Sequence, residues 1–278
     1  MQFDLHTHSN VSDGQLSPED VVRMAGLNGA TMLALTDHDH LGGLYEAAKV
    51  ADELGIQFIP GVEVSTSWRN RNIHVVGLNV DYNNTDFQKN LAKIRSGRLD
   101  RLVKINARFE KKGIRGVYDG ALALSSNADM VGRAHVARFL VNQGIVKNTA
   151  QAFSKFLGEG KSAYVSHQWA DFSEAVCWIR KAGGIAVLAH PGRYKLSATA
   201  LRELIEEFKT AGGRAIEVAS SSHAQNEILK FALLAERYEL LASSGSDFHV
   251  LGEGGRVLGR PPVLPAICCP IWREFAVE

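Results

Sequence analysis

Histidines and acidic residues recur where short apolar segments of this sequence end. Six segments follow this pattern: DLHTHS (4–9), LALTDHD (33–39), IPGVEVS (59–65), IHVVGL (73–78), AVLAHP (186–191) and SGSDFH (244–249). Imidazole and carboxylate groups are costly to remove from water unless a partner compensates their burial. A bound metal cluster is the simplest explanation for so many of these groups at the ends of buried strands.

The spacing within two of these motifs suits joint binding of one ion. Residues i and i+2 of an extended segment point to the same side, so His6 and His8 can reach one ion together. Asp247 and His249 repeat this spacing near the other end of the chain. Five further ligand types occupy equivalent positions, and these are Asp13, His38, Glu63, His74 and His190. An HxH pair alone is weak evidence for a metal site, but nine residues of ligand type at such positions predict a metal centre.

The nine candidates comprise six imidazoles, three carboxylates and no thiolate. This mixture suits Mn, Fe or Zn and disfavours both soft-metal sites and all-oxygen Mg or Ca sites. Nine side chains are too many for one ion. If three divalent ions bind, three carboxylates offset only half of their charge, which leaves a positive site for hydroxide and an anionic substrate. The pattern therefore predicts metal-assisted hydrolysis of a phosphate ester.

The elements that position these residues alternate between strands and helices. The first unit is complete, because Ser17 is a predicted N-cap, Pro18 takes the first helical position and Gly29 ends the helix. Continuous apolar strands that alternate with helices indicate parallel strands covered on both faces. Ligand types at the ends of many strands favour an α/β barrel over a doubly wound sheet, which gathers its chemistry at one switch point. Further helices are expected near 42–54 and at 173–182, 200–211 and 225–237.

Residues from about 83 to 165 interrupt this rhythm. They show helical patterns and no convincing strand, and the expected helices are 91–112, 119–126, 132–143 and 149–157. We therefore predict a barrel domain formed by residues 1–82 and 166–278. Residues 83–165 are predicted to form a helical insertion that caps the active site.

Composition excludes several classes of protein. A formal net charge of +1 in 278 residues gives no strong field toward nucleic acid or a membrane. No apolar run approaches about 18 residues, and the strand-like start after Met1 leaves no room for a signal peptide, so a cytoplasmic protein is expected. The three cysteines lack CxxC spacing, which predicts neither a disulfide framework nor a thiolate zinc site. The sequence has no heptad run that would indicate an obligate protein partner, so a monomer is expected.

Several of these motifs resemble those of a known family. DLHTHS, SDG, TDHD, GVEVS, HVVGL, AHPGRY and GSDFH are similar, in order from residue 3 to about 250, to the motifs of the polymerase and histidinol phosphatase (PHP) family. The resemblance implies a distorted (β/α)7 barrel similar to a TIM barrel. It also implies a trinuclear centre of divalent metal ions, with Mn expected first and Fe or Zn as alternatives.

The same resemblance distributes the nine side chains over three ions. It implies one ion held by His6, His8, Glu63 and Asp247, a second by Asp13, His38 and His249, and a third by Glu63, His74 and His190. Glu63 would bridge two ions. A water that bridges metal ions is expected to lose a proton and attack phosphorus. Asp247 is assigned a double role as ligand and as catalytic proton acceptor.

Four further residues are predicted to hold substrate. Arg133 and His135 lie in GRAH, which opens a predicted helix of the insertion, and a guanidinium there can clamp a phosphate with two N–H groups. GRAH resembles the GRPH-like stretch of one PHP branch, with Ala134 in place of proline. Arg193 directly follows the AHPG turn, which places it beside the metals. His223 follows another strand end, where a substrate-facing role and a structural role have equal support.

The motifs GRAH, YVSHQW and IEVASSSH, together with the insertion, resemble one PHP branch. That branch includes 3',5'-nucleotide bisphosphate phosphatases and 5'-to-3' exoribonucleases that act on short RNAs. A processive nuclease needs a basic, aromatic-lined groove, and the near-neutral charge argues against one. Five basic residues of the insertion are expected on a solvated helix face, and these are Arg95, Arg98, Arg101, Lys104 and Arg108.

We therefore expect hydrolysis of the 3'-phosphate of nucleoside 3',5'-bisphosphates such as pAp. Release of mononucleotides from short 5'-phosphorylated RNA or DNA is the alternative. A non-catalytic PHP domain that binds nucleotide or serves as a scaffold is a third hypothesis, but such relatives are expected to have lost ligands, and all nine positions are filled here. The expected partners are a small phosphorylated nucleotide or a short oligonucleotide, and no membrane.

Overall fold

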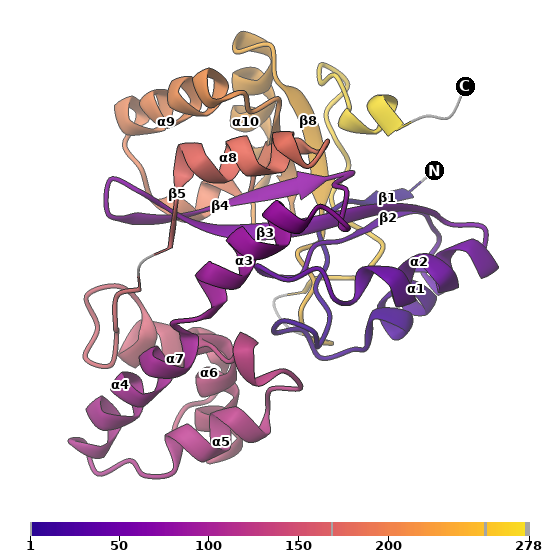
Figure 1. Ribbon diagram of the computed structural model, residues 1–278. Helices are drawn as coiled ribbons and strands as arrows, with labels where there is room; N and C mark the ends of the chain where they lie inside the picture. The colour runs from indigo at the N-terminus through magenta and orange to yellow at the C-terminus, as the bar shows by residue number, and fades with distance from the viewer. Residues whose placement is uncertain (1, 168, 253–254, 276–278) are drawn as a thin grey trace.

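Seven strands form a curved sheet that nearly closes into a barrel, as expected. The computed structural model describes residues 2–167, 169–252 and 255–275 (Figure 1). The strands follow the order β1 (Gln2–Asp4), β2 (Ala30–Leu35), β3 (Gln57–Trp68), β4 (Arg71–Leu78), β6 (Ile185–Leu188), β7 (Ala215–Ser220) and β8 (Leu241–Gly245). The short β5 (Ala170–Asp171) pairs with β3 beside this path. Backbone hydrogen bonds from Leu5 N to Ser244 O (3.0 Å) and from Asp247 N to His6 O (2.8 Å) join its two ends.

One strand does not follow the expectation of parallel pairing. β4 pairs antiparallel with both β3 and β6, whereas the other neighbours along the path are parallel. The reason lies in the connection, because only Arg69 and Asn70 separate Trp68 from its partner Arg71. Both turn residues have positive φ, 47° and 63°, which is the conformation that closes a tight β-hairpin. The prediction of parallel strands was therefore wrong for β4.

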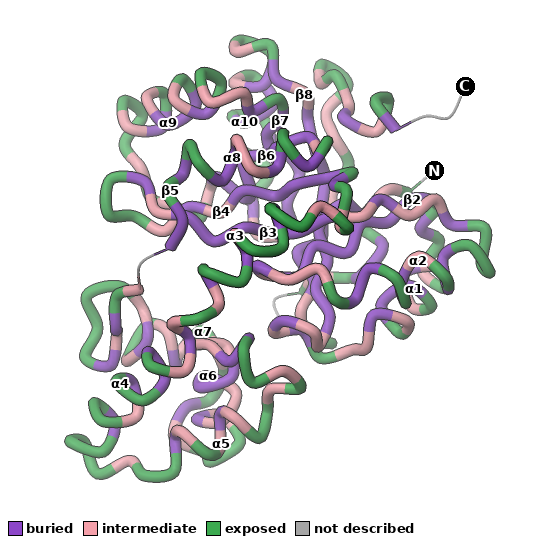
Figure 2. Tube along the Cα trace, in the orientation of Figure 1, coloured by how far each residue is buried: buried purple, intermediate pink, exposed green. Residues whose placement is uncertain are grey.

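Helices cover the outside of the barrel. They are α1 (Pro18–Leu27), α2 (Leu44–Glu53), α8 (Phe172–Lys181), α9 (Ala198–Ala211) and α10 (Gln225–Arg237). The predicted start of α1 is confirmed, because the Ser17 side chain accepts a hydrogen bond from Asp20 N at 3.2 Å. The strands are buried, while the outer helix faces are exposed (Figure 2). Fully buried aromatic rings such as Phe172, Phe208 and Phe231 pack the helices onto the sheet.

A second group of helices lies to one side of the barrel (Figures 1 and 2). α3 (Thr85–Arg95) leads to α4 (Arg98–Glu110), α5 (Val117–Ala123), α6 (Arg133–Asn142) and α7 (Thr149–Ala152), with a 3-10 helix at Ala128–Met130 and a π-helix at Phe153–Leu157. Residues 83–165, all of which the structure describes, contain no strand. α4 to α7 bury an apolar core of their own that includes Leu102, Phe109, Val136 and Leu140, whereas α3 packs into the barrel core through Phe87. This core supports the expectation of an insertion, while its division from the barrel at residues 83 and 165 stays a prediction.

The helix expected at 91–112 is in fact two helices. α3 ends at Arg95, and α4 begins at Arg98 with Gly97 as its N-cap. A Cβ at position 97 would lie 2.5 Å from His167 Cε1, so a glycine lets the chain pass this ring. After the break Arg98 and Arg101 point inward and are only 8% and 6% exposed. The prediction of a solvated basic face was wrong for these two residues, because the second helix has a new phase.

No helix in the described part of the chain is both long and apolar enough to cross a membrane.

Candidate metal centre

The structure brings the nine predicted ligands together at one end of the barrel. His6 and His8 follow β1, Asp13 precedes α1, His38 follows β2, Glu63 and His74 lie within β3 and β4, His190 follows β6, and Asp247 and His249 follow β8. The carboxyl ends of barrel strands meet at one mouth, which explains how residues so distant in the sequence become neighbours. The β3–β4 hairpin contributes two of them from adjacent antiparallel strands.

Glu63 lies at the centre of the cluster and is fully buried. Its Oε1 is 2.8 Å from both His74 Nδ1 and His190 Nε2. Its Oε2 faces three more imidazole nitrogens at 3.1 to 3.3 Å, those of His38, His6 and His8. One carboxylate therefore touches five of the six histidines, which is the arrangement expected of a group that bridges two ions.

Two other carboxylates flank Glu63. Asp247 Oδ1 lies 3.3 Å from His8 Nε2, and Asp13 Oδ1 lies 3.3 Å from His249 Nε2. Three sets of ligand atoms lie within 4.8 Å of one another: His6, His8, Glu63 and Asp247; His8, Asp13, His38 and His249; and His38, Glu63 and His74. The first set is the one that the resemblance implies, the second adds His8, and the third has His38 where the resemblance has His190. The assignment of ions to these sets stays a prediction.

Two of the nine residues have an unusual backbone. His190 has φ of 25° and Asp247 has φ of 50°, values that residues other than glycine adopt only rarely. Such strain persists where the surrounding structure imposes it, and it concentrates at functional sites. At both positions the chain has just left a strand, so the strained residue turns its side chain toward the cluster.

Many buried atoms of the cluster lack hydrogen-bond partners. Among the described residues, eight buried side-chain nitrogen or oxygen atoms have none, and six of these belong to the candidate ligands: His8 Nδ1, Asp13 Oδ1, His38 Nδ1, Glu63 Oε2, His190 Nδ1 and Asp247 Oδ1. Leaving such an atom unpaired costs about 1–3 kcal/mol, and most buried polar atoms are paired. Open imidazole and carboxylate atoms at this density fit bound divalent metal ions.

The charges of the cluster also suit metal binding. Burial raises the pKa of Glu63, but the neighbouring His38, His74 and His6 outweigh burial and hold this pKa well below its usual range. Burial lowers the pKa of His38 to about 3 and that of His190 to about 4. Metals bind ionised carboxylates and neutral imidazoles, so Glu63, His38 and His190 favour the binding forms at neutral pH. Burial lowers the pKa of His8 as well, but the neighbouring Asp247 and Glu63 outweigh burial and raise this pKa to about 9, so a metal ion that binds His8 must displace a proton.

Residues behind the ligands hold them in place, and the sequence analysis missed the most important one. Glu217 of β7 is buried, its Oε1 lies 3.3 Å from His6 Nδ1, and its Oε2 accepts a hydrogen bond from His190 N at 2.6 Å. The signal was present, because Glu217 is the single carboxylate in the apolar strand AIEVAS. Asp37 has a similar role: it accepts hydrogen bonds from both Ser9 and Ser12 and so fixes the loop before Asp13.

A cavity of about 250 Å³ opens beside the cluster. Asp13, His38 and His74 form part of its wall, and four arginines line it as well: Arg98, Arg101, Arg133 and Arg193. Arginine binds phosphate well because its planar guanidinium can donate two parallel hydrogen bonds. The cavity therefore suits a substrate that carries negative charge.

The two arginines predicted to hold substrate both line this cavity. Arg193 donates a hydrogen bond from Nη2 to Asp247 Oδ2, which places it directly against the cluster. Arg133 donates from Nη1 to Leu157 O at 3.2 Å and lies on the insertion side of the cavity. Their contact with substrate stays a prediction.

The two predicted substrate histidines lie elsewhere. His135 is 1% exposed, and its Nδ1 accepts a hydrogen bond from Gly132 N at 3.1 Å, at the start of α6. His223 Nε2 accepts from Gly192 N at 3.2 Å, and its Nδ1 lies 3.0 Å from Val218 O. Neither ring is among the described residues that line the cavity. Of the two roles predicted for His223, these contacts match the structural one, because they support the AHPG turn.

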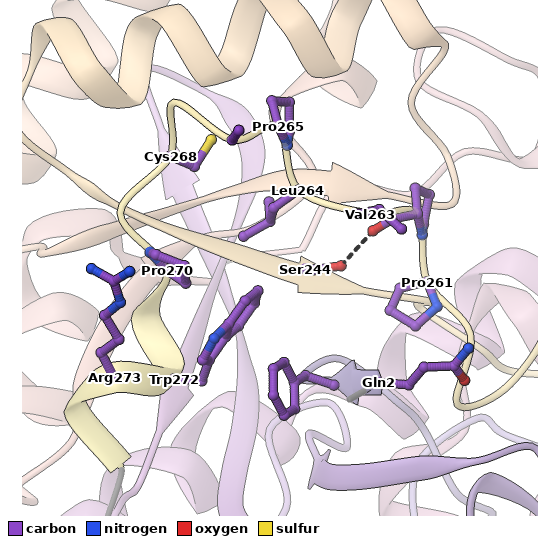
Figure 3. A pocket seen from close by; sticks show the side chains of 13 residues that line it. Gln2, Ser244, Pro261, Val263, Leu264, Pro265, Cys268, Pro270, Trp272 and Arg273 are labelled. Carbon is purple, nitrogen blue, oxygen red and sulfur yellow. Dashed lines mark hydrogen bonds between the residues drawn. The ribbon is translucent and has the colours of Figure 1, made fainter.

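Another cavity, of about 290 Å³, lies beside the start of β1 and the C-terminal segment (Figure 3). Its walls are mainly apolar, with Leu264, Pro270 and Trp272, and Ser244 Oγ donates a hydrogen bond to Pro262 O at 2.9 Å beside it. The described residues around it include no carboxylate and no histidine. It therefore offers no ligand set comparable to that of the metal centre.

Known proteins of similar sequence carry related names. A family model for the PHP domain matches residues 4–182. A relative from Chromobacterium violaceum, named 3',5'-nucleoside bisphosphate phosphatase, is 51% identical over 98% of this chain and 96% of its own length. A relative from Haemophilus influenzae, named 5'-3' exoribonuclease, is 43% identical over 99% of both chains.

Solved structures share the fold. An amidohydrolase structure from Chromobacterium violaceum, with bound sulfate and no metal, covers 99% of this chain and 95% of its own with a TM-score of 0.96 and 49% identity. A protein from Bifidobacterium adolescentis that is assigned as a metal-dependent phosphoesterase covers 98% of this chain and 94% of its own, with a TM-score of 0.82 and 25% identity. Because the family model matches more than half of the chain and these relatives span nearly all of it, this chain belongs to the PHP domain family.

Proposed function

We propose that this protein is a metal-dependent phosphoesterase that removes the 3'-phosphate from nucleoside 3',5'-bisphosphates such as pAp. The observation that carries the proposal is the set of open, buried ligand atoms beside a cavity lined by four arginines. The relative named 3',5'-nucleoside bisphosphate phosphatase supports this substrate, because its 51% identity extends over nearly the whole of both chains.

The proposal assigns the nine side chains to three divalent ions. His6, His8, Glu63 and Asp247 hold one, Asp13, His38 and His249 a second, and Glu63, His74 and His190 a third. A donor set of imidazoles and carboxylates suits Mn first, with Fe or Zn as alternatives. When bound, such ions polarise phosphoryl oxygens and make water acidic enough to serve as a nucleophile at neutral pH.

The residues of the chain orient the reacting groups. Arg193 lies against Asp247 and lines the cavity, so its guanidinium can balance charge on the phosphoryl group. Asp247 has one oxygen engaged by Arg193 and one open oxygen, Oδ1. In this proposal the open oxygen faces the cluster and accepts the proton that the attacking water loses. Asp247 would then be both a metal ligand and the catalytic base.

A second candidate function is 5'-to-3' exonuclease activity, and a neighbouring cleft of about 520 Å³ favours it. Arg138 and Gln15 line this cleft and also touch the metal cluster, because Arg138 donates to Asp13 O and Gln15 N donates to His249 O at 2.8 Å. Nucleotides beyond the cleaved bond would have room there, with Lys147 as a further cation. Relatives named exoribonucleases support this alternative.

Turnover of pAp against a 5'-phosphorylated pentanucleotide tests the proposal. We expect the Mn-loaded protein to show the higher kcat/KM on pAp, and Asp247→Asn protein purified in the same way measures any contaminating activity. A strong preference for the pentanucleotide would refute the phosphatase proposal in favour of exonuclease activity. Protein that holds two or more ions per chain yet hydrolyses neither would favour the non-catalytic hypothesis.

The proposal also includes a cytoplasmic location, a monomer without an obligate protein partner, and an insertion formed by residues 83–165 that caps the active site. The separate apolar core of α4 to α7 supports an insertion. The cavity beside the cluster, which Arg98, Arg101 and Arg133 line, supports its position over the site.

A further inference from the structure

The hydroxyl of Tyr194 is inserted between two strands that lead to predicted ligands. The antiparallel register of β4 and β6 places His74 opposite Ala189, one position beyond the last paired residues. The residues of a hydrogen-bonded pair in such a ladder exchange two direct backbone hydrogen bonds. One of these is present, from Ala189 N to His74 O at 3.2 Å. The other connection runs through Tyr194, because His74 N donates to Tyr194 Oη at 3.0 Å and Oη donates to Ala189 O at 2.7 Å.

The inserted hydroxyl holds the peptide group that leads into His190. The carbonyl of this group, from Ala189, accepts the hydrogen bond of Tyr194. Its N–H, from His190, donates to Glu217 Oε2 at 2.6 Å. Two side chains therefore hold both polar atoms of one peptide plane. His190 is also the residue with φ of 25°, so this plane is fixed at the point where the chain turns away from β6 and directs the imidazole toward the cluster.

The position of the hydroxyl is itself fixed. Pro191–Tyr194 form a 3-10 helix directly after His190, and Arg193 N donates to His190 O at 3.0 Å within it. The Tyr194 ring packs edge-on against the His190 ring, with 5.6 Å between their centroids, and against the hydrophobic core of the barrel. The short helix and the packing of the ring restrict the phenol, so the hydroxyl stays between the strands.

We propose that Tyr194 is a positioning residue that sets the geometry of His74 and His190 for binding of one metal ion. The imidazoles of both histidines converge on Glu63 Oε1, each at 2.8 Å. A direct hydrogen bond between the two backbones, with N and O about 2.9 Å apart, would leave no room for the hydroxyl and would draw Ala189 toward β4. The ring of His190 would then move relative to that of His74. This inference rests on the metal centre of the proposed function, and Tyr194 acts through two of its ligands without binding an ion.

Tyr194→Phe tests this role because it removes the hydroxyl and keeps the ring against His190. The two backbone groups that lose their partner can bond to each other, so we expect the variant to fold. Competition of Mn²⁺ binding against a chelator of known affinity, with the bound metal counted per chain, measures the affinity for each ion. We expect one ion to bind about 10- to 100-fold more weakly, the range for loss of a group that orients a ligand, and the other ions to keep their affinity.

Tyr238→Phe is the matched control, since the Tyr238 hydroxyl lies 3.5 Å from Glu206 Oε1 and Glu206 is outside the ligand cluster. We expect this control to bind every ion as the wild type does. Unchanged affinity for every ion in folded Tyr194→Phe would overturn the inference. An equal loss for every ion would overturn it as well, and so would the same loss in Tyr238→Phe.

Hydrogen exchange of the metal-free protein, followed by NMR, provides a second readout. The His74 N–H is expected to exchange slowly in the wild type, because the Tyr194 hydroxyl accepts its hydrogen bond. If Tyr194→Phe does not fold, this measurement decides, because a His74 N–H that exchanges as fast as an exposed amide would overturn the inserted hydroxyl. A wild type that binds Mn²⁺ but hydrolyses neither pAp nor the pentanucleotide refutes the proposed function instead, and the Mn²⁺ titrations still decide on Tyr194.

Discussion

Replacement of Glu217 by glutamine is a sharp test of how this fold positions its metal cluster. Burial raises the pKa of Glu217, but His6 outweighs burial and lowers this pKa, so the carboxylate is ionised at neutral pH. A carboxylate behind a ligating histidine fixes the tautomer and orientation of the ring and makes it a stronger ligand. Glutamine keeps the shape of the side chain, removes the charge, and replaces one carboxylate oxygen by an NH2 group, which cannot accept a hydrogen bond.

The expected effect on metal affinity is large because Glu217 serves two candidate ligands. Its Oε1 lies 3.3 Å from His6 Nδ1, and its Oε2 accepts the backbone N–H of His190 at 2.6 Å. Loss of one partner of this kind typically lowers metal affinity by about 10- to 100-fold, or about 1.4–2.7 kcal/mol. We expect Glu217→Gln to reach the upper end of this range, about 100-fold, because both ligands lose support.

Competition of Mn²⁺ binding against a chelator of known affinity measures this change. Glu46→Gln is the matched control, since Glu46 is exposed on α2. Thermal unfolding followed by circular dichroism establishes that each variant is folded before its affinity is compared. Equal Mn²⁺ affinity of folded Glu217→Gln and the wild type would refute the reasoning, and so would an equal loss in Glu46→Gln.

Three further outcomes are expected. Asp247→Asn lowers the initial rate on pAp by at least about 10²-fold, because the variant loses the open carboxylate oxygen beside Arg193; near wild-type rates with intact metal content would contradict its role. Chelation of the metals lowers the melting temperature as well as the rate, because ligands that bind only the native state stabilise it; unchanged melting after verified metal removal would argue against the cluster. Gly97→Ala destabilises the protein by about 1–3 kcal/mol in urea unfolding, because its Cβ would lie 2.5 Å from His167 Cε1; wild-type stability would show that this ring yields freely.

The parts of the fold that were predicted correctly depend on local rules. The start of α1 follows from the residues of one turn, because the hydroxyl of Ser17 caps an N–H group three positions later. The shared direction of His6 and His8 follows from the twofold period of extended chain, and their Nε2 atoms lie 3.1 Å apart. Both rules act over a few residues, so they can be read without knowledge of the rest of the molecule.

The parts that were missed depend on contacts between distant segments. The direction of β4 depends on a two-residue turn, and its antiparallel pairing with β6 depends on how the sheet is assembled. Arg98 and Arg101 looked like solvent-exposed residues because their partners, Asp39 and Trp169, belong to other elements. The lack of room for a side chain at Gly97 depends likewise on the ring of His167, 70 positions further along the chain.

The residue types and strand periods of this chain are sufficient to predict nine metal-ligating side chains at the ends of its strands and a positive site suited to a phosphate ester. How these side chains group around Glu63, that Glu217 lies against His6, and which arginines line the cavity beside them follow only from the nearly closed barrel and the helices that pack beside it. The physical reason is distance along the chain, because 127 residues separate Glu63 from His190 and 211 separate His6 from Glu217. No local preference of the backbone specifies contacts over such separations, and they arise only when the strands pair into the sheet.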